Sequence, residues 1–161
     1  MTAVTTSLIS ADEFLSGDHP TGSELIDGVV HMNDPTFPHN RLCKRIDLAL
    51  TRWTEGPGSG ESGQGGNWVL SNGQVYKPDV WWVAVPPEGA RHDGPPDLAV
   101  EVRSPKTRRL DIGRKRDEYR ASGTTELWYA AHPWTDSTGS CSGDAPIDDR
   151  VVFRPGWVSG R

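Results

Sequence analysis

Hydrophobic positions along the chain predict one long amphipathic helix and several short strands. In residues 38–53 apolar side chains recur at every third or fourth position, which is the repeat of a helix with one buried face. Elsewhere the apolar residues form short runs rich in Val and Trp, bounded by Gly and Pro, as is typical of strands. These predicted strands are residues 68–70, 79–85, 97–103 and 126–131.

The first part of the chain carries two local signals with a clear physical basis. Ser10 and Glu13 have the spacing of a capping box, in which each side chain bonds the backbone N–H of the other, so a short helix is predicted there. Further on, Asp27-Gly28 lies between apolar pairs within residues 24–32. This dipeptide favours a tight turn, which predicts a hairpin of two short strands.

The order of the later elements predicts how the strands connect. Residues 108–121 form a predicted helix between the strands 97–103 and 126–131, ending at Ser122-Gly123. A crossover of this length joins parallel strands with a right-handed connection. The strands 79–85 and 97–103 are expected to be neighbours, and residues 150–154 could add an edge strand. The fold class is therefore α/β, more exactly an α+β mixed sheet flanked by helices.

The composition is that of a folded but loop-rich protein. A chain of 161 residues has the length of a single domain, which we expect to span residues 1–161. Hydrophobic residues make up only 34%, with 18 Gly and 13 Pro, but seven Trp supply large apolar surfaces. The Gly-rich stretch 56–66 is expected to be a flexible surface loop that cannot pack. Residues 133–161 are expected to be a polar tail.

The sequence argues against several classes of protein. The N-terminus lacks the features of a secretory signal, and no run approaches the roughly 20 apolar residues that span a bilayer. We therefore expect a cytoplasmic protein that has no membrane partner. A net charge of −5 argues against a general nucleic-acid coating protein. Cys43 and Cys141 are far apart and are expected to be free thiols outside any zinc site.

Two carboxylates are the strongest candidates for chemistry. Asp79 opens one predicted strand and Glu101 lies within the next, so both side chains could meet although 22 residues separate them. Two converging carboxylates repel each other unless a cation lies between them. Oxygen ligands of this kind suit Mg²⁺ or Mn²⁺, which would activate water and neutralise charge on a phosphate.

Positive charge is concentrated directly after these strands. Residues 103–120 contain eight basic and three acidic residues, a net charge of +5 in an acidic protein, which is the footprint expected for a phosphate backbone. Within the predicted helix, Lys115 and Tyr119 would share one stripe with Asp111, at the spacing of one turn. If this stripe faces the strand ends, Lys115 can reach the metal-bound water or a phosphate oxygen. The candidate substrate contacts in this segment are Arg103, Arg108, Arg109 and Tyr119.

These motifs together resemble a known superfamily. Pro78-Asp79 followed by Glu101-Val102-Arg103 resembles the PD-(D/E)XK nucleases, which have the restriction-endonuclease-like fold. More narrowly, the segments ELIDGVV, KPDVWWV and PPDLAVEVRSPKTRRLDIGRKRDEYRASGTTELW resemble the Uma-two family of bacterial restriction endonucleases. The resemblance covers residues 10–132 and includes an isolated Pro38-His39.

The resemblance implies a fold and a set of site residues. It implies a restriction-endonuclease-like core with a central mixed sheet, in which Asp79 and Glu101 hold the metal ion. The superfamily lysine is replaced by Arg103, which cannot deprotonate and serves only as a charge clamp, so Lys115 from the following helix takes its place. The same comparison implies that Glu24 is a third metal ligand and that His39 contacts the substrate or a proton. A homodimer, which would cut both strands, is also implied.

Structural interpretations of the same residues stay open. Asp79 could be a turn residue at a strand start, Glu101 could face solvent, and Lys115 could lie on a solvated helix face. Glu24 could be a charge at a strand edge, and His39 a capping or core histidine. The leading prediction is a Mg²⁺-dependent endonuclease acting on DNA. The alternatives are an inactive nucleic-acid-binding or regulatory module of the same fold, and a hydrolase of a small phosphorylated metabolite.

Overall fold

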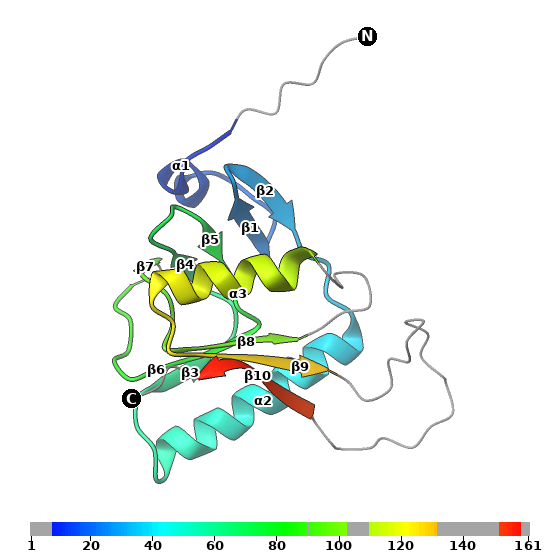
Figure 1. Cartoon of the computed structure of the whole chain (residues 1–161), viewed down its shortest axis with the longest axis vertical. Coiled ribbons are helices and arrows are strands. Elements are labelled where there is room, and N and C mark those ends of the chain that lie inside the picture. Colours follow the sequence, from blue (N-terminus) through cyan, green and yellow to red (C-terminus); the bar gives the residue numbers. More distant parts are fainter. Residues whose placement is uncertain (1–7, 90, 103–109, 132–151, 159–161) are drawn as a thin grey trace, which may run out of the picture.

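The part of the chain that the structure describes forms two β-sheets and three helices (Figure 1). The computed structural model describes residues 8–89, 91–102, 110–131 and 152–158. The helices are α1 (Ala11–Ser16), α2 (Phe37–Glu55) and α3 (Leu110–Ser122). None of them is both long enough and apolar enough to cross a membrane.

The central sheet has the strand order β10-β9-β8-β6-β3. Pairing of β8 with β9 is parallel, and α3 makes the crossover between them, as the order of the elements predicted. The β6–β8, β3–β6 and β9–β10 pairs are antiparallel, so the sheet is mixed. Its strands are β3 (Glu61–Gly63), β6 (Val80–Val83), β8 (Leu98–Val102), β9 (Glu126–Ala131) and β10 (Val152–Val158).

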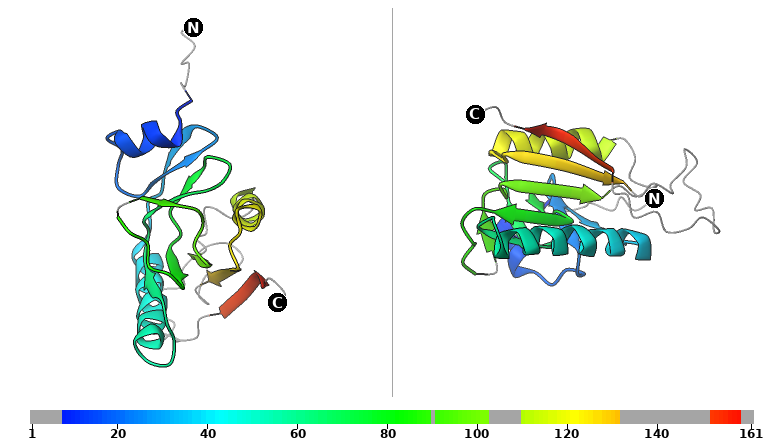
Figure 2. Two further views of the ribbon diagram at one scale, coloured as in Figure 1. Left: turned by 90° about the vertical axis from the view of Figure 1, so that its left-hand side faces the viewer. Right: turned by 90° about the horizontal axis from the view of Figure 1, so that it is seen from below.

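Helices cover both faces of the central sheet (Figure 2). On one face, Leu42 and Ile46 of α2 pack against alternate residues of β8, such as Val100. On the other face, Tyr119 of α3 packs against Ala99 and other residues that point the opposite way. Because successive side chains of a strand alternate between faces, the near-continuous apolar sequence of β8 serves both layers. The expected mixed sheet flanked by helices is confirmed.

A second, smaller sheet lies beside the first and has the order β2-β1-β5-β4-β7. The predicted hairpin is confirmed: Asp27 and Gly28 both have positive φ, at 52° and 73°, as the tight turn requires. The predicted capping box of Ser10 and Glu13 is also confirmed at the start of α1. The strands are β1 (Ser23–Ile26), β2 (Val29–Met32), β4 (Asn67–Val69), β5 (Val75–Tyr76) and β7 (Arg91–Asp93).

The expectation of a Gly-rich loop that cannot pack is wrong for part of residues 56–66. Residues Glu61–Gly63 form β3 and pair with β6 at the edge of the central sheet. A side chain at Gly63 would meet the indole of Trp81 at 2.5 Å, so glycine here makes room for a large ring. The predicted edge strand 150–154 is present as β10 but lies further along the chain. The single-domain organisation stays a prediction.

Candidate active site

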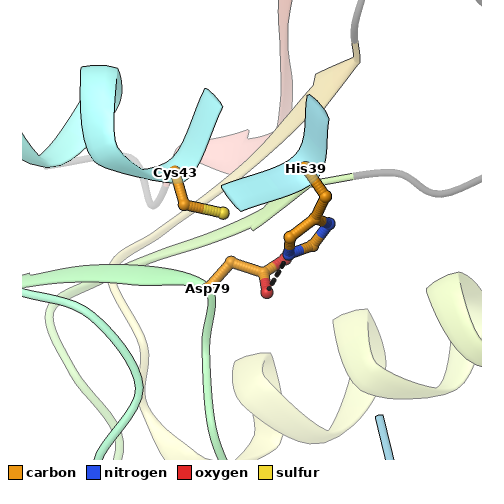
Figure 3. A group of neighbouring side chains, drawn as sticks. All are labelled: His39, Cys43 and Asp79. Carbon is orange, nitrogen blue, oxygen red and sulfur yellow. Dashed lines mark hydrogen bonds and ion pairs between the residues drawn. The ribbon is translucent and has the colours of Figure 1, made fainter. Parts of the chain in front are cut away.

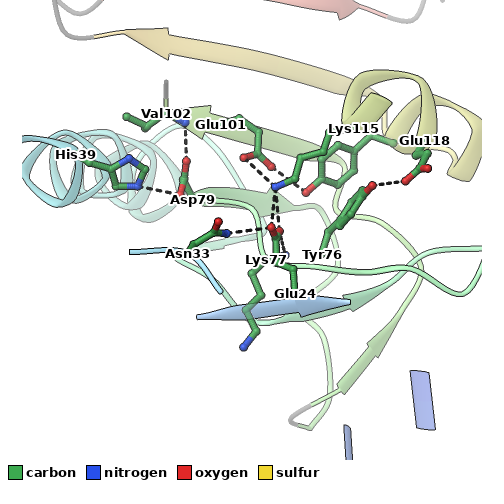
Figure 4. Close-up of polar contacts among 11 residues, drawn as sticks. Glu24, Asn33, His39, Tyr76, Lys77, Asp79, Glu101, Val102, Lys115 and Glu118 are labelled. Atoms are coloured by element: carbon green, nitrogen blue, oxygen red, sulfur yellow. Dashed lines mark hydrogen bonds and ion pairs between the residues drawn. The ribbon is translucent and has the colours of Figure 1, made fainter. Parts of the chain in front are cut away.

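Side chains from both sheets and both longer helices meet in one cavity of about 540 Å³. His39 comes from α2, Asp79 directly precedes β6, Glu101 lies on β8 and Lys115 lies on α3. These four residues follow one another across the site in Figure 4. Residues that are far apart in the sequence therefore form one polar centre.

Strand pairing brings the two expected carboxylates to the same place. Val80 of β6 pairs with Val100 of β8, so Asp79 lies beside the end of β8 that carries Glu101. The backbone N–H of Val102 donates to Asp79 Oδ2 at 2.6 Å, which fixes this carboxylate against the strand. Its other oxygen, Oδ1, lies 3.0 Å from His39 Nε2. Asp79 is thus part of a hydrogen-bonded centre rather than only a turn residue.

Glu101 points away from the α2 side of the sheet and towards α3. Its flanking residues, Val100 and Val102, pack in the core below α2, and the alternation of the strand turns Glu101 the other way. Tyr119 donates its hydroxyl to Glu101 Oε1 at 3.2 Å, and Lys115 Nζ is 3.5 Å from Oε2. Burial raises the pKa of Glu101, the nearby charge of Lys115 opposes this, and Asp79 and Glu24 raise it further.

Glu24 is buried within the hairpin strand β1 and holds Lys115. Lys115 Nζ donates to both oxygens of Glu24, at 2.9 and 3.1 Å. The backbone N–H of Lys77 donates to Oε1 at 2.9 Å, and Asn33 Nδ2 donates to Oε2 at 3.0 Å. These four contacts match the acceptor capacity of a carboxylate. A metal ion on Glu24 would have to replace one of them, and that expected role stays a prediction.

Lys115 is buried rather than solvated, with 7% of its surface exposed. Besides its ion pairs with Glu24 and Glu101, its ammonium lies 5.1 Å from the ring centre of Tyr76. The stripe predicted on α3 therefore faces the strand ends through Lys115 and Tyr119. A lysine held between two carboxylates inside a cavity has a fixed position, which is what a group that orients a reactant needs.

The cavity contains a second lysine that the sequence analysis did not select. Lys77 lines the cavity next to Pro78-Asp79, and within the described residues its ammonium has no hydrogen bond or ion pair. Figure 4 shows this ammonium turned away from Glu24. Burial lowers the pKa of Lys77, and the charge of Glu24 opposes the shift. Its position two residues before Asp79, in Lys77-Pro78-Asp79, was the signal available in the sequence.

The donor set of the cavity fits a divalent cation. Asp79 and Glu101 contribute carboxylate oxygens from adjacent strands, and each raises the energetic cost of the other's charge. Lys115 compensates only part of this negative charge because it is also paired with Glu24. Oxygen ligands with excess negative charge suit Mg²⁺ or Mn²⁺.

The other predicted substrate contacts have different outcomes. Tyr119 is completely buried and donates its hydroxyl to Glu101, and its expected contact with substrate stays a prediction. Part of the basic run is neutralised, because Arg114 pairs with Asp27 and Glu118. The substrate contacts expected at Arg103, Arg108 and Arg109 lie outside the described residues, as does Cys141.

The position of Cys43 differs in part from what the sequence predicted. His39 lies four residues before it, a separation that places both side chains on one face of α2, and both line the cavity near Asp79. Cys43 is a free thiol, as expected, but the expectation that no histidine lies at a short spacing from it is wrong. The short His-x-x-x-Cys spacing was visible in the sequence and would have indicated this cluster.

A mixed sheet between two helices, with acidic residues at the junction of β6 and β8, defines a protein of the restriction-endonuclease-like class. Residues 12–135 match the model of the Uma2 family, described as "Putative restriction endonuclease". The chain belongs to this family, which confirms the resemblance found in its motifs. No curated protein matches its sequence.

The fold is also found in a solved structure. The chain is similar to the crystal structure of a "putative nuclease belonging to DUF820" from Anabaena variabilis, with a TM-score of 0.70. The two sequences are 17% identical, and the similarity covers 79% of this chain and 76% of the other. At this level of identity the comparison establishes the shared fold.

Proposed function

We propose that this protein is a metal-dependent endonuclease that hydrolyses phosphodiester bonds in DNA. The observation that carries the proposal is the convergence of Asp79, Glu101 and Lys115 in one cavity, although the three residues come from different elements. Membership of the Uma2 family supports the same reaction class. A cytoplasmic location and a homodimer stay predictions from the sequence.

Asp79 and Glu101 are the residues that would hold the cation, Mg²⁺ or Mn²⁺. When bound, such an ion neutralises charge that develops on the phosphate and favours deprotonation of water. Asp79 is kept in place by the Val102 N–H, and Glu101 by the Tyr119 hydroxyl. These contacts fix the two carboxylates before substrate arrives, so little reorganisation is needed during the reaction.

Lys115 orients the attacking water or stabilises charge on a phosphate oxygen. Glu24 holds its ammonium through both carboxylate oxygens, and Glu101 lies on the other side. Glu24 is therefore a positioning residue that acts through Lys115. The fixed ammonium supplies hydrogen bonds directed at the reacting group, which is the usual source of catalytic stabilisation in such sites.

Lys77 and His39 are the proposed contacts to the remainder of the substrate. Lys77 lines the cavity, and its long side chain can bring the ammonium to a phosphate oxygen, which accepts a hydrogen bond from it. His39 lies on the side of Asp79 that faces away from Glu101, within reach of a leaving group or a second phosphate. Arg103, Arg108 and Arg109 are retained as proposed phosphate contacts on the sequence evidence alone.

The test is cleavage of plasmid and oligonucleotide substrates by the purified protein with Mg²⁺, with Mn²⁺ and with EDTA. We expect cleavage only with a divalent ion, and a loss of about 100-fold or more in rate for Asp79→Asn, Glu101→Gln and Lys115→Met. Glu88→Gln and Lys44→Met alter exposed residues outside the cavity and serve as matched controls. Unchanged cleavage in the three site variants, with folding intact, would exclude this function.

The same experiment separates the two alternatives. DNA binding that weakens with salt, survives EDTA and never leads to cleavage would indicate a binding or regulatory module. Release of phosphate from a small phosphomonoester, without DNA cleavage, would indicate a hydrolase of phosphorylated metabolites.

A further inference from the structure

Helix α2 brings two metal-ligating side chains to the Asp79 side of the cavity (Figure 3). One potential ligand atom from each of His39, Cys43 and Asp79 can be chosen so that all three lie within 4.8 Å of one another. His39 and Asp79 are already in contact, with 3.0 Å between Nε2 and Oδ1. The group thus combines a nitrogen, a sulfur and an oxygen donor at one point.

We propose that His39, Cys43 and Asp79 form a binding site for a thiophilic divalent cation such as Zn²⁺ or Co²⁺. The site shares Asp79 with the Asp79–Glu101 pair but differs in its donor chemistry. Imidazole and thiolate are preferred ligands of Zn²⁺, whereas Mg²⁺ prefers oxygen. Zn²⁺ would therefore bind Asp79 together with His39 and Cys43, whereas Mg²⁺ would bind it together with Glu101.

The geometry needs only small side-chain movements. Bonds from Zn²⁺ to sulfur and nitrogen are about 2.3 and 2.0–2.1 Å, so ligand atoms around one ion lie roughly 3.5 Å apart. The Cys43 sulfur, now within 4.8 Å of the other two ligand atoms, would have to approach them by up to about 1 Å. His39 Nε2 and Asp79 Oδ1, now 3.0 Å apart, would separate slightly, and rotation of the side chains can supply both movements. Three protein ligands leave a fourth position for water from the cavity, as in other accessible zinc sites.

Cys43 is buried but lines the cavity, so an ion in the cavity can reach its sulfur. Burial raises the pKa of the Cys43 thiol, and the charges of Asp79 and Glu101 raise it further. The same carboxylates attract a cation, which offsets the cost of forming the thiolate. Burial, the larger cause of the raised pKa, opposes formation of the thiolate, whereas the negative potential of the two carboxylates favours binding of a cation.

The surroundings of His39 limit the affinity. Its Nδ1 atom is buried and, among the described residues, has no hydrogen-bond partner. Ligating histidines usually donate this second N–H to an acceptor that strengthens the metal bond. We therefore expect weaker binding than at a structural zinc site with four protein ligands.

The shared use of Asp79 should make Zn²⁺ affect Mg²⁺-dependent cleavage. This expectation rests on the proposed function. An ion bound to His39 and Cys43 holds Asp79 towards α2 and competes with Mg²⁺ for it. Zn²⁺ is then expected to inhibit Mg²⁺-dependent cleavage in the wild type and to do so less in Cys43→Ser.

The test of the site itself is independent of cleavage. The full-length protein, reduced with a reagent that contains no thiol, is titrated with Co²⁺ and its absorption spectrum is recorded. We expect a near-ultraviolet sulfur-to-cobalt charge-transfer band that disappears on addition of Zn²⁺. Cys43→Ser should abolish the band, and His39→Gln, which keeps the thiol, should weaken Co²⁺ binding by more than about tenfold.

Cys141→Ser is the matched control and should leave the band unchanged. Circular dichroism and thermal unfolding check that Cys43→Ser folds, and protection of Cys43 from alkylation by Zn²⁺ in the wild type gives a second measurement. The proposal is overturned if the wild type shows no band at saturating Co²⁺, or if the band survives in Cys43→Ser and is lost in Cys141→Ser. It is equally overturned if Zn²⁺ leaves Cys43 alkylation unchanged.

Discussion

Lys115 on α3 donates to both carboxylate oxygens of Glu24 on β1, although 91 residues separate them in the chain. Both side chains are almost completely buried, with 8% and 3% exposed. The ion pair joins the helix that crosses over the central sheet to the smaller sheet. This contact therefore connects α3 to the smaller sheet and fixes the ammonium that we propose for catalysis.

Glu24→Gln should destabilise the protein strongly and lower its activity. Removing one partner of a buried ion pair leaves an uncompensated charge, and we expect a loss of about 3 kcal/mol in the free energy of unfolding. The double variant Glu24→Gln/Lys115→Met should lose less than the sum of the two single variants. Urea unfolding of all four proteins measures this coupling.

The exposed pair Arg116–Asp117 provides the comparison. Its removal should cost less than about 1 kcal/mol and show little coupling, because water screens both charges. If the double variant loses as much free energy of unfolding as Glu24→Gln and Lys115→Met together, the two residues do not act as a unit.

Lys77→Met should raise KM by about tenfold, with kcat nearly unchanged. This corresponds to the loss of one charge-assisted hydrogen bond to a phosphate, worth roughly 1.5 kcal/mol in both the bound and the transition state. Steady-state cleavage of an oligonucleotide gives both constants. Lys44→Met, which alters an exposed residue of α2, should change neither; a fall in kcat without a change in KM for Lys77→Met would point to a role in the reaction itself.

Arg114→Met should bring the pKa of Asp27 back towards its usual value. The hydrogen bonds from Arg114, followed by that from Gln74, lower the pKa of Asp27 to about 2. Since the folded-state value lies below the unfolded one, these contacts stabilise the protein above about pH 4, and this contribution is lost as the pH falls towards 2. NMR titration of the Asp27 carboxyl carbon follows the shift.

The control for this titration is Arg120→Met, which alters an exposed residue of the same helix. It should leave the Asp27 titration unchanged. An unaltered pKa of Asp27 in Arg114→Met would show that the ion pair between Arg114 and Asp27 is not maintained in solution.

Alanine substitutions of two glycines should have opposite effects on stability. At Gly63 a Cβ would lie 2.5 Å from the Trp81 ring, so Gly63→Ala should cost roughly 1–3 kcal/mol through overpacking. At Gly113, inside α3, nothing lies within 4 Å of an added Cβ. Gly113→Ala should therefore gain up to about 1 kcal/mol from helix propensity. Thermal unfolding distinguishes the two; equal effects would contradict the close packing at β3.

Elements with a strong local pattern were predictable from the sequence. The spacing of Leu42 and Ile46 identified α2, and the Asp27-Gly28 turn identified the β1–β2 hairpin. The alternation of side chains along β8, which turns Glu101 away from Val100 and Val102, follows from the same local geometry. These features depend on backbone geometry within a few residues, which the order of apolar and polar residues records directly.

Contacts between distant segments were decided by the tertiary structure. The expected strand order brought Asp79 and Glu101 together, and the family resemblance added Lys115 from the following helix. It did not show that Glu24 would hold Lys115, or that residues 61–63 would pair with β6 below Trp81. Such contacts depend on how the two sheets pack and on which buried charges form ion pairs. The local pattern of apolar and polar residues does not determine either.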